Sequence, residues 1–151
     1  MEQATHVLDL VRVLAGEVAE VTGGAAPSTR EGRDVPDATA ALLRLESGAV
    51  GTVSTSCVLP APTAAGLEVL ADGTSVHLTE TSLRVRTRAG DEDLTPSVEP
   101  RTAVDRAFAD VVAGRPAPPG LVDVAEALAT HRLAWAVAEA ARTGTTVRVP
   151  R

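Results

Sequence analysis

Three residues near the start of the chain could act together in chemistry. Glu2, His6 and Asp9 fall within one narrow arc when this segment is drawn as a helix. A histidine beside a carboxylate can transfer a proton near neutral pH, because the carboxylate orients the imidazole ring and favours its charged form. The same spacing also suits two or three metal ligands, or an ordinary solvated helix face. Spacing alone favours the solvated face, since such triplets are common on helices.

Two further histidines and an arginine-rich segment are weaker candidates. His77 alternates with apolar neighbours, so we expect it on a polar sheet face, where it could contact a ligand. Arg84, Arg86 and Arg88 could form an anion-binding strip, although such alternation more often marks a solvated or edge strand. His131 shares a helical stripe with apolar residues, so we interpret it as a core residue.

The composition excludes several kinds of chemistry. Every one of the 14 basic residues is arginine, so the chain cannot supply a lysine for a Schiff base or a phosphate loop. The glycines do not form a GxGxxG motif between a strand and a helix, and the P-loop, CxxC and HExxH patterns do not occur. We therefore expect neither a metal site nor a cofactor site within this chain.

The charge and the cysteine content indicate a cytoplasmic protein. The net charge is −6, and no basic stretch alternates with aromatic residues, which argues against nucleic acid as a partner. The single cysteine, Cys57, suits a reducing compartment and is interpreted as a small core residue. There is no signal-peptide layout, and no apolar run approaches the roughly 20 residues that span a bilayer, so no membrane partner is expected.

The hydrophobic pattern predicts one α+β domain over residues 1–151. Turn signals at Ser47-Gly48 and Asp72-Gly73 indicate two β-hairpins, and residues 24–38 and 89–100 are expected to be loops. The order favours an open, mostly antiparallel β-sheet with helices packed on one face. The expected elements are a helix at 3–15, strands at 17–23, 39–46, 49–58, 67–71, 75–79 and 82–88, helices at 101–113 and 121–142, and a strand at 146–150.

Three segments in order resemble the C-terminal domain of the glucose–fructose oxidoreductase / inositol dehydrogenase / MocA family. The segment EQATHVLDLVRVLAGEV is similar to the family's acidic residue, histidine and aspartate followed by a short helix. VPDATAALLRLESGAVGTVSTS resembles its double strand. AFADVVAGRPAPPGLVDVAEALATHRLAWAVAEAARTGTTVRVP resembles its C-terminal helices and closing strand. Together the three segments cover nearly the whole chain.

The resemblance implies roles for particular residues. His6 matches the family's catalytic or substrate-binding histidine, Glu2 matches the acidic residue four positions earlier, and Asp9 matches a more structural aspartate. His77 and Arg84 join His6 as candidate substrate-binding residues. In this family an N-terminal Rossmann domain binds NAD(P), and its Glu-Lys-Pro motif supplies a catalytic lysine. The C-terminal domain supplies an open sheet for substrate binding and dimerisation.

Two hypotheses of function follow. The first is a stand-alone C-terminal domain of an NAD(P)-dependent sugar or polyol dehydrogenase. It would be inactive alone and would bind NAD(P) only through a missing or separate Rossmann-bearing subunit. The second is a non-enzymatic homodimeric scaffold or a module that binds a small polar ligand. Under both hypotheses we expect a homo-oligomer formed through the open sheet face.

Overall fold

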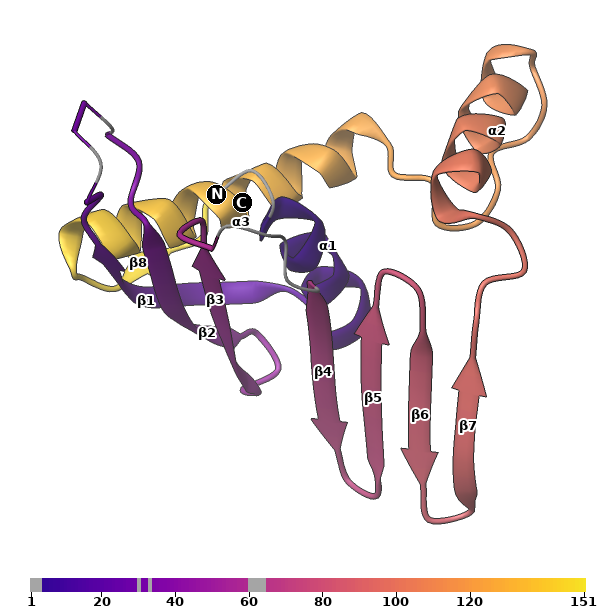
Figure 1. Cartoon of the computed structure of the whole chain (residues 1–151), viewed down its shortest axis with the longest axis horizontal. Helices are drawn as coiled ribbons and strands as arrows, with labels where there is room; N and C mark the ends of the chain where they lie inside the picture. The colour runs from indigo at the N-terminus through magenta and orange to yellow at the C-terminus, as the bar shows by residue number, and fades with distance from the viewer. Residues whose placement is uncertain (1–3, 30, 33, 60–64) are drawn as a thin grey trace. The chain divides into compact units, whose positions relative to one another are not determined.

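The computed structural model describes residues 4–29, 31–32, 34–59 and 65–151. These residues divide into two compact units. Unit 1 comprises Met1–Thr63 and Ala125–Arg151, and unit 2 comprises Ala64–Val124. Figure 1 shows the two units, each with its own sheet. That the whole chain forms one domain stays a prediction.

Unit 1 contains a four-stranded antiparallel sheet, here called sheet 1, whose strands lie in the order β3-β2-β1-β8. Strand β2 shows why this sheet has a buried and an exposed face, because its residues alternate between buried and exposed positions along its whole length. The elements of unit 1 are α1 (Ala4–Ala15), β1 (Val18–Ala26), β2 (Ala38–Leu45), β3 (Val50–Ser56), α3 (Val124–Thr143) and β8 (Val147–Arg148).

Helices α1 and α3 cover one face of sheet 1. The fully buried side chains come from all three layers: Leu8 from α1, Val21 and Leu43 from the sheet, and Leu133 and Val137 from α3. Burying these aliphatic side chains removes apolar surface from water, which is the main favourable contribution to folding. The core therefore fixes α1 and α3 against the sheet without any aromatic residue.

Unit 2 contains a four-stranded antiparallel meander, here called sheet 2, in the order β4-β5-β6-β7. Its elements are β4 (Gly66–Ala71), β5 (Thr74–Thr79), β6 (Leu83–Thr87), β7 (Gly90–Leu94) and α2 (Pro100–Val112). Helix α2 begins after Glu99, whose carboxylate accepts hydrogen bonds from the N–H groups of Arg101 and Thr102. No side chain of α2 is buried.

The structure confirms the α+β class and the open antiparallel arrangement. Both predicted hairpin turns are present, with Gly48 at φ 88° and Gly73 at φ 69°, a conformation that favours glycine. The strands form two sheets, which the hydrophobic pattern did not distinguish. None of the described helices is long and apolar enough to cross a membrane.

The prediction of a loop over residues 89–100 was wrong for its first part. Residues Gly90–Leu94 form β7, although GDEDL lacks the alternation typical of a strand. The strand forms because Thr87 and Gly90 close a tight turn and because Asp91 and Asp93 pair with arginines of β6. Cross-strand charge pairs of this kind stabilise a sheet where apolar contacts are few.

Candidate functional site

Helix α1 presents His6 to solvent and buries its opposite side. His6 is exposed, whereas Ala4, Leu8 and Val11 are at most 8% exposed. Near the end of the helix, Leu14 is 46% exposed. Glu2 lies outside the described residues. The helix thus places an imidazole where a ligand could reach it.

Asp9 contacts α3 through Thr130. Its Oδ1 accepts a hydrogen bond of 2.6 Å from Thr130 Oγ1 and lies 3.8 Å from Nη1 of Arg12. A hydroxyl that donates to a carboxylate makes a short, charge-assisted hydrogen bond. Asp9 therefore attaches α1 to α3, one turn from His6.

Arg12 is the centre of a network that the sequence analysis did not identify. Its side chain is only 6% exposed, and its guanidinium reaches Glu17 beyond the end of α1 and Glu126 and Thr130 on α3. The pKa of Arg12 is raised above its ordinary value, first by the hydrogen bonds with Glu17 and further by Glu126, while burial acts in the opposite direction. The side chain is charged, because an arginine guanidinium is not deprotonated in proteins. The contacts with α3 join residues more than 110 positions apart, so no local pattern could have predicted them.

His77 and Arg84 lie side by side in sheet 2. They are directly opposite each other on β5 and β6 and point to the same exposed face. Glu68 lies opposite His77 on β4, and Asp93 lies opposite Arg84 on β7. One row across all four strands therefore carries a carboxylate, an imidazole, a guanidinium and a second carboxylate. Such a row can donate and accept hydrogen bonds with a polar ligand.

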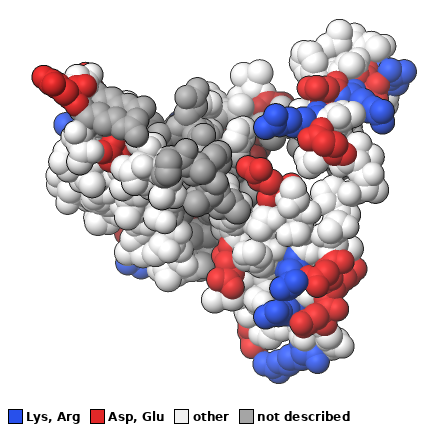
Figure 2. Space-filling view, in the orientation of Figure 1, with Lys and Arg blue, Asp and Glu red and all other residues white. Residues whose placement is uncertain are grey.

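Arg84 and Arg86 of β6 and Arg88 in the turn after it do not form a positively charged strip. Arg84 pairs with Asp93, Arg86 with Asp91 at 3.4 Å, and Arg88 with Asp72 at 3.1 Å. The hydrogen bond between the first pair raises the pKa of Arg84 and lowers that of Asp93. Figure 2 shows blue and red side chains interleaved over this sheet. The strand is solvated, as expected, but it is an inner strand of sheet 2 and its charges are compensated.

The interpretation of His131 as a core residue was wrong. His131 is exposed, together with Leu128 (49%) and Trp135 (53%), on the outer side of α3. The helix instead buries the side that carries Thr130, Leu133, Ala136, Val137 and Ala140. Small side chains on that side allow a close approach to the sheet, because a Cβ at Gly23 would lie only 3.4 Å from the backbone nitrogen of Ala141. Helical spacing alone could not decide between the two sides.

The interpretation of Cys57 as a core residue was also wrong. Cys57 is exposed directly after β3, where its Sγ lies 3.6 Å from the carbonyl oxygen of Asp37. Asp37 itself is buried and accepts hydrogen bonds from the N–H and Oγ1 of Thr29, both at 2.8 Å. The aspartate of the VPDATAALL segment therefore stabilises the loop between β1 and β2.

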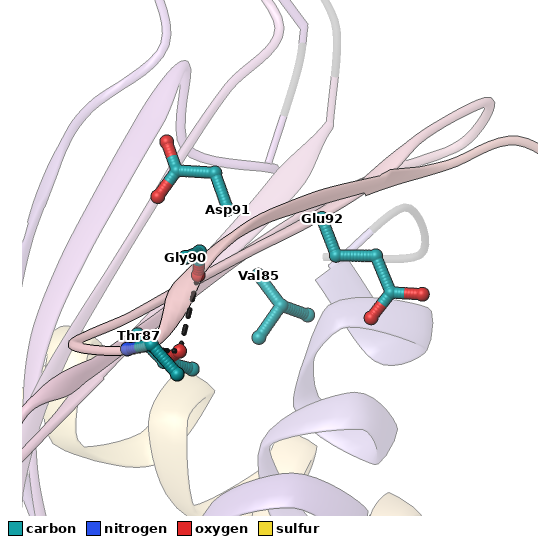
Figure 3. A pocket seen from close by; sticks show the side chains of 6 residues that line it. Val85, Thr87, Gly90, Asp91 and Glu92 are labelled. Carbon is teal, nitrogen blue, oxygen red and sulfur yellow. Dashed lines mark hydrogen bonds between the residues drawn. The ribbon is translucent and has the colours of Figure 1, made fainter.

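A shallow hollow of about 380 Å³ lies on the β6–β7 hairpin. It is lined by Val85, Thr87, Ala89, Gly90, Asp91 and Glu92. Figure 3 shows the carboxylates of Asp91 and Glu92 directed apart and the hydrogen bond between Thr87 and Gly90. Binding sites usually combine an apolar lining with converging polar groups, so we do not place the substrate in this hollow. Among the described residues, no group of three His, Cys, Asp or Glu side chains could hold a metal ion.

Comparison with known proteins identifies the class of protein to which this fold and helix α1 belong. Residues 1–84 match the GFO/IDH/MocA C-terminal domain. The chain therefore belongs to this oxidoreductase family, as the resemblance predicted. No curated protein matches the chain in sequence.

Solved structures with the same fold are dehydrogenases and oxidoreductases. Levoglucosan dehydrogenase in complex with NADH is 20% identical with a TM-score of 0.78, covering 98% of this chain and 49% of that chain. A putative oxidoreductase from Thermotoga maritima is 15% identical with a TM-score of 0.80, covering 97% and 45%. The WlbA dehydrogenase from Bordetella pertussis, in complex with NADH and UDP-GlcNAcA, is 24% identical with a TM-score of 0.66, covering 100% and 45%. The chain spans about half the length of these structures.

The described residues do not fit a dinucleotide. A dinucleotide phosphate group binds where a glycine-rich turn leads from a strand into the N-terminus of a helix. Among the described elements, a strand leads into a helix only at residues 95–99, between β7 and α2. This connection contains no glycine. Glycines with positive φ lie instead in hairpin turns such as Gly48, after helices such as Gly16 and Gly144, or in loops such as Gly120. The described part of the chain therefore lacks the glycine-rich connection from a strand to a helix that holds a dinucleotide phosphate.

Proposed function

We propose that the chain is the substrate-binding half of an NAD(P)-dependent dehydrogenase that acts on a sugar or polyol, and that it is inactive alone. The observation that carries this proposal is His6, which is exposed on α1 within the segment that matches the family. The structural neighbours support the class of substrate, because levoglucosan dehydrogenase and the UDP-GlcNAcA complex of WlbA share the fold.

In the proposed reaction, this chain supplies the base that accepts the proton of the substrate hydroxyl. Oxidising a secondary alcohol requires a base to accept that proton, and an imidazole is suited to this role near neutral pH. His6 accepts the proton in this proposal, and Glu2 orients its ring. On sheet 2, His77 and Arg84 are separate candidates for hydrogen bonds with a polar ligand, since both are exposed on one sheet face.

The nicotinamide cofactor belongs to a separate Rossmann-bearing subunit in this proposal. The chain contains no lysine, and its described residues do not fit a dinucleotide. The partner subunit would therefore supply both the cofactor and the lysine of the Glu-Lys-Pro motif.

A reconstitution assay tests this proposal. The chain is mixed with NAD or NADP and a panel of polyols, with and without a Rossmann-domain protein encoded in its genomic neighbourhood, and NAD(P)H formation is followed by absorbance. We expect activity only with the partner, and a loss of about 10²- to 10⁴-fold in His6→Ala, the range typical of a lost general base. His131→Ala is the matched control, because it removes an exposed imidazole from another helix. Equal activity of His6→Ala and the unaltered chain would contradict the proposed role.

A second candidate function is a non-enzymatic homodimeric scaffold. The face of sheet 1 opposite the helices exposes Leu42 (44%) and Val50 (64%) next to Thr52 and small side chains. Exposed apolar side chains on a flat sheet face commonly mark an interface with another protein. A second copy of the chain would offer the same surface, and such a homodimer is compatible with either function.

Sedimentation velocity tests the dimer. We expect Leu42→Glu to convert a dimer into a monomer, because it places a charge in the centre of the proposed interface. Leu70→Glu is the control, since Leu70 is 72% exposed on sheet 2. A monomeric unaltered chain at all concentrations would argue against this interface.

A further inference from the structure

We propose that Arg12 is a positioning residue, which fixes the rotation of α1 on α3 and thereby the place of His6. This inference rests on the proposed role of His6. The contacts of Arg12 alone would suggest only a role in the stability of unit 1.

All five N–H groups of the Arg12 guanidinium are used. Nε donates to Glu17 Oε2 at 3.1 Å, and Nη2 donates to Glu17 Oε1 at 2.7 Å and to Glu126 Oε2 at 2.9 Å. Nη1 donates to the carbonyl oxygen of Glu126 at 3.0 Å and to Thr130 Oγ1 at 2.8 Å. A lysine has three N–H donors without the planar fork, so it cannot reproduce these contacts.

Thr130 connects this guanidinium to the turn next to His6. Its hydroxyl accepts from Arg12 and donates to Asp9 at 2.6 Å, so one residue of α3 holds two successive turns of α1. Asp9 lies one turn after His6. Rotation of α1 about its axis would therefore break directional hydrogen bonds as well as move the imidazole.

Stability alone does not require a guanidinium at this position. The apolar contacts of Leu8 and Val11 bury the helix but are not directional. Replacing a buried ion pair with a well-packed apolar side chain is often neutral or stabilising. The specific contribution of Arg12 is thus the orientation of α1, which the apolar contacts leave undetermined.

The test uses the three histidines of the chain as probes in NMR spectra of their ring protons. Thr130→Val removes the hydroxyl that bridges Arg12 and Asp9, and Thr130→Ser retains it. Arg12→Lys keeps the charge but not the fork, and it serves as the second variant should Thr130→Val fail to fold. Arg44→Lys is the control, because Arg44 is an exposed arginine with one partner, Glu20 at 3.0 Å.

We expect Thr130→Val and Arg12→Lys to shift or broaden the His6 ring signals, while those of His77 on sheet 2 stay unchanged. The amides of α1 should lose about tenfold of their protection from hydrogen exchange, the effect of one lost charge-assisted hydrogen bond. Thr130→Ser and Arg44→Lys should match the unaltered chain. Unchanged His6 signals and α1 protection in both test variants would overturn the inference.

The reconstituted enzyme separates this inference from the proposed function. If both hold, Thr130→Val should lower kcat more than it changes KM, and Thr130→Ser should restore it. Altered His6 signals combined with equal activity of His6→Ala would support the positioning by Arg12 and refute the catalytic role of His6.

Discussion

Two adjacent glycines of β1 offer a direct test of how closely this strand packs against β2 and α3. A Cβ at Gly23 would lie 2.9 Å from the carbonyl oxygen of Ala40, 3.2 Å from Cβ of Ala41 and 3.4 Å from the backbone nitrogen of Ala141. A Cβ at Gly24 would meet nothing within 4 Å. The two positions share a strand and differ in which face of the sheet they occupy.

Gly23→Ala should destabilise unit 1, and Gly24→Ala should not. Overpacking against backbone costs about 1–3 kcal/mol, and the reduced entropy of the unfolded chain returns about 0.4–1 kcal/mol, which leaves a net loss of about 1–2 kcal/mol in the free energy of unfolding. Gly24→Ala retains only the second effect, so the free energy of unfolding should stay equal or rise slightly.

Urea unfolding followed by the fluorescence of Trp135 measures both variants, because the single tryptophan lies on α3 in unit 1. With a slope of about 1–2 kcal/mol/M, Gly23→Ala should lower the midpoint by about 1 M relative to Gly24→Ala. Equal midpoints for the two variants would refute the close packing of Gly23 against β2 and α3.

Three further predictions concern the core, the cap of α2 and the β1–β2 loop. Leu8→Ala should lower the free energy of unfolding in urea by about 2–5 kcal/mol, because Leu8 is fully buried. Val13→Ala, at a position that is 70% exposed, should change it by no more than about 0.5 kcal/mol. Similar effects of the two substitutions would contradict the assigned buried and exposed faces of α1. Hydrogen bonds, first that from the backbone N–H of Thr102, lower the pKa of Glu99. The ionised Glu99 therefore stabilises α2 above the ordinary titration range of glutamate, and this stabilisation is lost as the pH falls through the lowered pKa. Hydrogen exchange of α2 should accelerate in acid, and Glu99→Gln should remove most of this pH dependence. Asp37→Ala should cost about 1–3 kcal/mol and expose the β1–β2 loop to proteolysis, since the N–H and hydroxyl of Thr29 lose the buried carboxylate that accepts their hydrogen bonds. Unchanged cleavage by trypsin would count against that role.

Local patterns predicted much of the secondary structure. Amphipathic spacing located α1 and the exposed side that carries His6, and glycine chemistry located the hairpin turns at Gly48 and Gly73. Alternation placed His77 on an exposed sheet face. Each of these features depends on residues within a few positions of one another, which is the range over which a sequence pattern is informative.

Long-range contacts account for most of what the sequence did not predict. Strand β7 depends on charges of β6, and the buried side of α3 depends on close approach to β1. The network of Arg12 joins the start of the chain to a helix more than 110 residues later. An arginine at the edge of an apolar stripe has many possible partners, and only the fold selects among them.

The most direct test of the account compares the pH dependence of kcat/KM for the unaltered chain and His6→Ala, each reconstituted with its Rossmann-bearing partner. We expect kcat/KM of the unaltered chain to rise with pH, because a general base acts only in its unprotonated form. His6→Ala should lose that rise together with about 10²- to 10⁴-fold of the activity. An unchanged profile and rate in His6→Ala would contradict the central claim that this chain supplies the residue that accepts the hydroxyl proton.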